Sequence, residues 1–222
     1  MTWNVIGGVD EAGRGSLIGP IIVAGVSMRE IYLKSLMNFG IKDSKLLSPL
    51  KRRTFFGKIV DYSSSICVCK IQTCEIDKNV RYNNLNYLEA RAMATVIDNI
   101  HASKIYVDSC DVSPARFKRA IFSQLSFNSP EIISMHRADK LNLVVAAASI
   151  IAKVIRDNEI YKLRTRFGNI GSGYPSDKIT KRFVEQWFDN NKSFPYFVRK
   201  SWKPIKKILN EATYINLYEA GL

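Results

Sequence analysis

Histidine is scarce in this sequence, which has only His101 and His136 among its 222 residues. Two separated histidines disfavour Ser-His nucleophilic catalysis and the His-rich clusters that bind transition metals. We therefore expect carboxylates to carry any catalysis.

Cysteine is also sparse, and three of its four copies lie close together as Cys67, Cys69 and Cys74. This Cys-x-Cys-x4-Cys spacing lacks a fourth ligand nearby, so it favours small core residues over a zinc site. Proteins of a reducing compartment typically have few cysteines, and we expect no signal peptide at the start of this chain. We expect a cytoplasmic protein.

Long apolar runs are missing as well. The longest, residues 141–152, is too short to cross a bilayer and ends at Lys153. We predict no membrane segment. A chain of 222 residues, 46% of them hydrophobic, can form one sizeable core or a core domain with a smaller appendage.

Negative charge is in deficit, since the formal net charge is +13 and the isoelectric point is near 9.6. Residues 178–207 hold nine Lys or Arg and only two acids, with aromatic residues between them. This pattern predicts a packed unit whose basic surface binds a nucleic-acid backbone. The alternative is a solvated charged face on a helical cap.

Strand and helix patterns alternate along the chain, which favours a mixed α/β sheet with helices on both faces. We expect strands at residues 3–9, 18–28, 63–76, 105–107 and 131–135. We expect helices at residues 48–60, 85–100, 114–125 and 141–166, the last apolar all round in its first half and therefore buried. A glycine-rich stretch ends that helix, so we divide the chain into residues 1–170 and a C-terminal helical segment, 171–222.

Two adjacent acids, Asp10 and Glu11, end the first strand and are followed by Gly13-Arg14-Gly15. Neighbouring side chains on a strand point to opposite faces, so one site could use both acids only if the chain bends at Glu11. The glycines give the backbone that freedom, and Arg14 adds a fixed positive charge. The alternative is a tight turn with solvated acids.

Two further acids lie at the edges of predicted elements. Asp108 follows one buried strand, and Asp139 lies between another strand and the long helix. If the strand ends converge, the four acids would repel one another strongly enough to need cations, and oxygen ligands favour Mg²⁺ or Mn²⁺. Two such ions can promote phosphodiester hydrolysis. Alternatively, Asp108 caps the turn into Ser113 and Asp139 is the N-cap of the long helix.

The chain resembles ribonuclease HII, the type 2 ribonucleases H, in its archaeal form. Motifs that carry the resemblance run in order along nearly the whole chain. They are Asp10-Glu11-Ala12-Gly13-Arg14-Gly15, Asp43-Ser44-Lys45, Tyr106-Val107-Asp108, His136-Arg137-Ala138-Asp139, Ala148-Ser149-Ile150-Ile151-Ala152-Lys153 and Gly171-Ser172-Gly173-Tyr174-Pro175. Ser16 and Ala147 are mild departures from the family pattern.

The resemblance implies an RNase H-like fold, with a mixed sheet of about five strands flanked by helices and a C-terminal helical extension. It implies that Asp10, Glu11, Asp108 and Asp139 are the catalytic, metal-binding acids. Gly13, Arg14 and Gly15 would contact the ribose 2′-hydroxyl, Lys45 a phosphate, and Tyr174 the sugar 3′ to the cut. Taken alone, Tyr174 would be a core tyrosine.

The implied substrates are RNA/DNA hybrids and duplex DNA that contains a single ribonucleotide, cut on its 5′ side to leave a 3′-hydroxyl and a 5′-phosphate. We expect a monomer. A related nuclease or integrase would share the acids but ignore the 2′-hydroxyl. Type 3 enzymes carry an extra N-terminal domain, for which the residues before Gly8 leave no room. A non-catalytic binder would leave the four acids unexplained.

The tail, residues 213–222, weakly resembles a sliding-clamp-binding peptide, although it lacks the usual glutamine. The preferred alternative is a helix that packs on the core.

Overall fold

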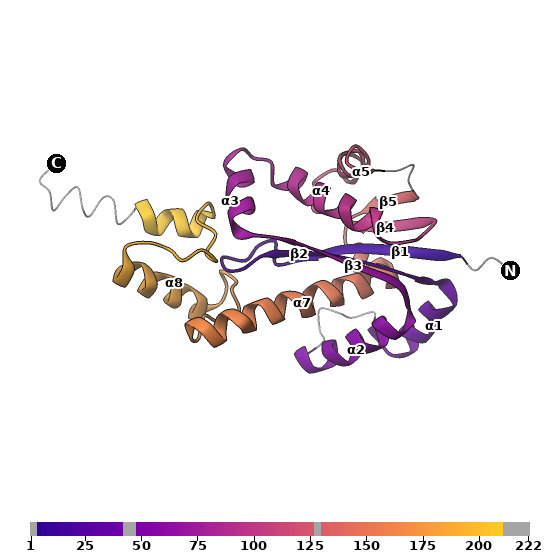
Figure 1. Ribbon diagram of the computed structural model, residues 1–222, viewed down its shortest axis with the longest axis horizontal. Helices are drawn as coiled ribbons and strands as arrows, with labels where there is room; N and C mark the ends of the chain where they lie inside the picture. Colours follow the sequence, from indigo (N-terminus) through magenta and orange to yellow (C-terminus); the bar gives the residue numbers. More distant parts are fainter. Residues whose placement is uncertain (1–3, 42–47, 127–129, 211–222) are drawn as a thin grey trace, which may run out of the picture. The chain divides into compact units, whose positions relative to one another are not determined.

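A five-stranded mixed sheet forms the centre of the fold, in the computed structural model, which describes residues 4–41, 48–126 and 130–210. The strands are β1 (Val5–Ala12), β2 (Ile21–Arg29), β3 (Ser63–Ile71), β4 (Lys104–Asp108) and β5 (Glu131–Met135). Their order is β3-β2-β1-β4-β5, with β2 antiparallel to both β1 and β3, and β1, β4 and β5 parallel (Figure 1). The predicted fold class is therefore confirmed.

Helices flank this sheet in the places where the hydrophobic pattern predicted them, and three more within residues 30–141 were not predicted. The named helices are α1 (Glu30–Asn38), α2 (Pro49–Tyr62), α3 (Thr73–Arg81), α4 (Leu85–Asp98), α5 (Pro114–Phe122), α6 (Ala138–Leu141), α7 (Leu143–Phe167) and α8 (Lys178–Asn191). Residues 203–210 are also helical. None of the helices in the described ranges is long and apolar enough to cross a bilayer.

Two sequence predictions about element boundaries are wrong. The strand expected at residues 63–76 ends at Ile71, because Gln72 and Glu75 form a reciprocal capping box that starts α3. The long helix expected at residues 141–166 begins at Leu143 instead, because Asn142 has an extended backbone and accepts the Val144 N–H through its side chain.

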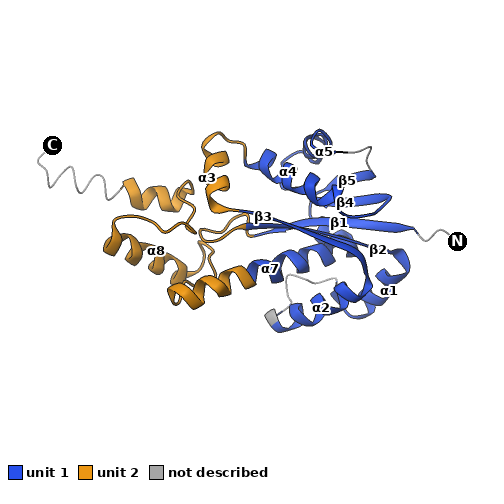
Figure 2. Cartoon of the chain, in the orientation of Figure 1, with its two compact units in different colours: residues 1–12, 21–71, 85–157 blue, residues 13–20, 72–84, 158–222 orange. Residues whose placement is uncertain are grey.

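The chain groups into two compact units (Figure 2). Unit 1 holds residues 1–12, 21–71 and 85–157, and unit 2 holds residues 13–20, 72–84 and 158–222. Helix α7 is continuous across the division at residue 157. The functional division predicted at residue 170 stays a prediction.

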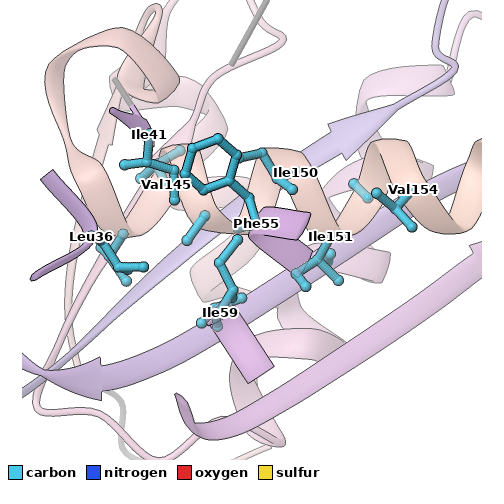
Figure 3. Packing of buried hydrophobic residues seen from close by; sticks show 14 of the residues in the cluster. Leu36, Ile41, Phe55, Ile59, Val145, Ile150, Ile151 and Val154 are labelled. Atoms are coloured by element: carbon cyan, nitrogen blue, oxygen red, sulfur yellow. The ribbon is translucent and has the colours of Figure 1, made fainter. Parts of the chain in front are cut away.

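The core of unit 1 is built around the first half of α7. Residues 144–152 are all buried, as their mostly apolar sequence predicted. Figure 3 shows Val145, Ile150 and Ile151 packed with Phe55 and Ile59 of α2. An apolar helix can be enclosed in this way only if it lies close to the sheet.

Gly8 allows that close approach. A Cβ atom placed on Gly8 would lie 2.4 Å from the carbonyl carbon of Val144 and 2.5 Å from the Val145 nitrogen. These are backbone atoms near the start of α7, so they cannot move aside as a flexible side chain can. The missing side chain of Gly8 therefore sets how β1 and α7 pack, two residues before Asp10.

We predict that Gly8→Ala lowers the free energy of unfolding by about 1–3 kcal/mol, because the added methyl overpacks this contact. The matched control is Gly57→Ala, since Gly57 is an exposed residue within α2 and a Cβ there meets nothing within 4 Å. That change should stabilise the protein by about 0.5–1 kcal/mol. Urea unfolding measures both values. Equal stability of Gly8→Ala and the unmodified protein would contradict the close packing.

Candidate active site

Strand β1 continues through both acids of the Asp10-Glu11 pair. Asp10, Glu11 and Ala12 pair with Ala24, Val23 and Ile22 of β2 in unbroken antiparallel register. The bend expected at Glu11 is therefore wrong, and the turn begins at Gly13, whose φ is 86°. Because side chains alternate along a strand, Asp10 and Glu11 lie on opposite faces of β1.

Asp10 and Asp108 lie side by side at the carboxyl ends of two parallel strands. Val9 of β1 is in register with Val107 of β4, so the next residues, Asp10 and Asp108, are level and share a face of the sheet. Asp10 is only 4% exposed. Burial, and secondly the charge of Asp108, raise the pKa of Asp10 to about 7. The prediction that acids from distant stretches meet at one edge holds for this pair.

Asp139 is a buried residue at the same end of the sheet, in the short helix α6 that follows β5. The Ala138 N–H donates to Oδ1 of Asp108 at 2.8 Å, which ties the start of α6 to β4. Asp139 is inside α6 and is not the N-cap of α7. Ser113 itself caps α5, and Asp111 accepts its N–H, so Asp108 does not cap that turn. The two capping alternatives are thus wrong.

Ser149 and Lys153 of α7 complete the surroundings of Asp10. The Ser149 hydroxyl is hydrogen-bonded to Asp10 and, like the charge of Lys153, favours the ionised carboxylate. Lys153 Nζ donates to Ser149 Oγ at 2.7 Å. This role of Ser149 was not predicted, because the residue is buried within an apolar run; its i, i+4 spacing from Lys153 on a helix was the available signal.

These acids have the chemistry of a site for a hard divalent cation. Their donors are all carboxylate oxygens, and Oε2 of Glu11 and Oδ1 of Asp139 are buried. In the described ranges, however, no three His, Cys, Asp or Glu side chains are grouped closely enough to hold a metal ion. Asp10 and Asp108 share a face, whereas Glu11 is on the other. A single pocket of all four acids therefore stays a prediction.

In unit 2, Arg199 holds the Gly13-Arg14-Gly15 turn. Its side chain is fully buried and donates to the carbonyl oxygens of Gly13 and Arg14, both at 2.7 Å, and of Gly19 at 3.0 Å. A planar guanidinium can satisfy three acceptors in fixed directions, which a lysine cannot. Arg199 was predicted to be part of a basic surface, and its full burial shows that this prediction is wrong for Arg199.

Tyr174 lies next to a residue that contacts the segment just after this turn. The Gly173 carbonyl accepts the N–H groups of Leu17 at 2.7 Å and Ile18 at 3.2 Å. Asp177 is the N-cap of α8 and also accepts the Ser172 N–H. These hydrogen bonds, that from the Ser172 N–H above all, lower the pKa of Asp177 to about 2. Tyr174 itself is half-buried. Unit 2 thus brings together the two glycine-containing segments that the resemblance assigns to the substrate.

Lys45 and the tail at residues 213–222 lie outside the described residues. Their predicted contacts with a phosphate and with a sliding clamp stay predictions.

Comparison with known proteins decides the family. The Ribonuclease HII profile matches residues 7–205. The chain belongs to the ribonuclease HII family. Ribonuclease HII from Thermococcus sibiricus is 43% identical over 91% of this chain and 90% of its own, and that from Cenarchaeum symbiosum is 43% identical over 90% of this chain and 96% of its own. The chain is therefore a ribonuclease H, a phosphodiester hydrolase.

Solved structures of ribonucleases H share the fold. The crystal structure of ribonuclease H2 from Pyrococcus horikoshii matches with a TM-score of 0.86 and 40% identity, over 93% of this chain and 98% of its own. Ribonuclease HII from Archaeoglobus fulgidus, solved in a complex with PCNA, matches with a TM-score of 0.82 and 34% identity, over 91% of this chain and 96% of its own. The chain thus has the ribonuclease HII fold over nearly all of its length.

The raised pKa of Asp10 predicts a pH dependence of stability in the presence of a chelator. Ionisation of Asp10 costs more in the folded than in the unfolded chain, so its stabilising contribution is complete below pH 4 and is lost as the pH rises through 7. The loss can reach about 4 kcal/mol. Asp10→Asn should abolish it, whereas Asp61→Asn, at an exposed site on α2, should not. Thermal unfolding from pH 4 to 8 measures this. Parallel curves for the unmodified protein and Asp10→Asn would contradict the assignment.

Proposed function

We propose that this ribonuclease H is an endonuclease that hydrolyses the RNA strand of RNA/DNA hybrids and cuts duplex DNA on the 5′ side of a single embedded ribonucleotide. Water adds across the bond between phosphorus and O3′, which leaves a 3′-hydroxyl and a 5′-phosphate. The observation that carries this proposal is the carboxylate pair of buried Asp10 and half-buried Asp108, at the ends of two parallel strands in a chain of this family.

The acids Asp10, Glu11, Asp108 and Asp139 would hold divalent cations, Mg²⁺ or Mn²⁺, in a two-metal-ion site. Such ions, when bound, activate a water molecule and offset the negative charge on the leaving oxygen. Oxygen-only donors suit both metals. Repulsion between Asp10 and Asp108 raises the cost of ionising both, so the pair is poised to gain from a positive charge.

Ser149 and Lys153 would orient Asp10 toward this site. The hydroxyl of Ser149 fixes one rotamer of the carboxylate, and the ammonium of Lys153 holds the hydroxyl. Both residues project from the buried half of α7, where the packing leaves them little freedom. Asp10 would therefore be positioned before any substrate binds.

The turn formed by Gly13, Arg14 and Gly15 would recognise the ribose 2′-hydroxyl. Telling RNA from DNA requires a contact to this group, and backbone atoms of a glycine-containing turn can approach it closely. Two hydrogen bonds from Arg199, to the Gly13 and Arg14 carbonyl oxygens, limit the movement of the turn. Tyr174, next to the Gly173 carbonyl that is bound to the same segment, would stack on the sugar 3′ to the cut, and Lys45 would contact a phosphate.

The C-terminal segment from residue 171 onward would bind the substrate backbone. Lys178, Lys181 and Arg182 are exposed on the first turns of α8. Their positive charge favours a duplex without reading its sequence. A clamp partner is the lesser alternative for the tail; the Archaeoglobus fulgidus relative was solved with PCNA.

A duplex that carries one ribonucleotide and a 5′ label tests the proposed function. We predict Mg²⁺-dependent cutting on the 5′ side of the ribonucleotide, and its loss with a chelator. Asp139→Asn should slow cutting at least about a hundredfold while duplex binding stays within a few fold, because the acid acts on the reaction. Asp61→Asn is the control for the loss of one carboxylate.

Two outcomes would contradict the proposal. Equal cutting of an all-DNA duplex would show a nuclease that ignores the 2′-hydroxyl. Undiminished cutting by Asp139→Asn would show that this acid takes no part in the reaction.

A further inference from the structure

Unit 2 contains a cavity of about 390 Å³ that the site described above does not use. Its walls come from α3 and from residues 196–200. This volume lies within the range of about 300–1,000 Å³ that is typical of small-molecule sites. The lining residues that matter here are Cys74, Lys78, Arg81, Tyr82, Tyr196 and Lys200.

The cavity is strongly basic. Lys78, Arg81 and Lys200 are exposed, and in the described part of the chain none forms an ion pair with a carboxylate. The one acid in the lining is Asp77, which accepts hydrogen bonds from the Lys200 and Ser201 N–H groups at 3.0 and 2.9 Å and from the Ser201 hydroxyl at 2.6 Å. Asp77 thus joins the two walls of the cavity. Its charge is engaged in these hydrogen bonds, so the three cations give the cavity its positive charge.

Two tyrosine rings accompany these cations. Tyr82 is 70% exposed and Tyr196 is 65% exposed, although large aromatic rings usually bury much of their surface. Tyr196 is held from behind by edge contacts with Phe197 and Phe167, and its carbonyl accepts the Thr73 hydroxyl of α3. One ring is therefore fixed in place, and both can stack on a ligand.

The segment 196–200 has two different faces. Tyr196, Val198 and Lys200 line the cavity, whereas Phe197 and Arg199 are buried in the interior of unit 2. Arg199 is the residue that holds the turn at Gly13. The same segment therefore both lines the cavity and carries the residue that anchors the turn.

We propose that this cavity binds an unpaired nucleotide segment of a nucleic-acid strand. Cations together with exposed aromatic rings are the combination that recognises single strands, since phosphates need positive charge and an unpaired base exposes its flat faces for stacking. A duplex hides those faces. Lys78, Arg81 and Lys200 bind the phosphates, and Tyr82 and Tyr196 stack on bases. The inference adds a single-strand site to the duplex-cutting function proposed above.

The test is fluorescence anisotropy in chelator and constant low salt, with labelled oligothymidylate and a labelled blunt duplex as the two probes. The doubly substituted variant Arg81→Ala/Tyr82→Ala should bind oligothymidylate at least about tenfold more weakly, because it loses one stacking contact and one phosphate contact. Its affinity for the blunt duplex should change much less.

The matched control is Lys118→Ala/Tyr161→Ala, which removes one exposed cation and one exposed tyrosine, the latter also 65% exposed, away from the cavity. An equal loss in this control, a larger loss for the duplex than for the single strand, or no binding of oligothymidylate by the unmodified protein would each overturn the proposal. Cutting is blocked by the chelator, so these results do not depend on the proposed catalysis.

Cys74 gives a second readout because it is exposed and lines the cavity. Bound oligothymidylate should slow alkylation of Cys74, measured by mass spectrometry, and leave the half-buried Cys110 unaffected. Unchanged alkylation of Cys74 at saturating oligothymidylate would place the bound strand elsewhere and overturn the proposal.

Discussion

The burial of Asp10 beside Asp108 is the interaction on which the rest of the site depends. Two carboxylates on one face of neighbouring parallel strands repel each other, and burial removes the water that would screen them. A protein gains no stability from this arrangement, since the ionised pair costs free energy. The arrangement becomes favourable when a cation binds, so the fold maintains at a cost in stability a site that is suited to metal-dependent chemistry.

Each unit holds its own predicted functional residues by buried contacts. In unit 1, Gly8 lets α7 approach β1, and the same helix then presents Ser149 and Lys153 to Asp10. In unit 2, Arg199 fixes the Gly13 turn, and hydrogen bonds to Gly173 bring the Tyr174 segment to it. The acids proposed for catalysis and the groups proposed for substrate recognition are thus each held by buried contacts of their own unit, although only Ala12 and Gly13 separate Glu11 from Arg14 in the sequence.

The sequence predicted most elements of the sheet, because apolar runs such as residues 105–107 and 144–152 leave little choice of environment. It also identified Asp10 and Asp108, because each directly follows an apolar strand, residues 3–9 and 105–107. It did not predict where β1 ends, since pairing with β2 keeps Glu11 in the strand and overrides the glycines that follow. It could not predict the role of Arg199, because a buried arginine with three carbonyl acceptors and an exposed one look alike in a basic sequence. Helix α3 was missed because its start depends on a capping box that the β-branched residues before it obscured.

The most direct test of the central claim is anomalous X-ray diffraction from crystals of the protein soaked in Mn²⁺. The account predicts an anomalous peak within coordination distance of the carboxylates of both Asp10 and Asp108, and its loss in Asp10→Asn crystals. The absence of an anomalous peak at this pair in crystals saturated with Mn²⁺, or the presence of peaks only at other acids, would contradict the account.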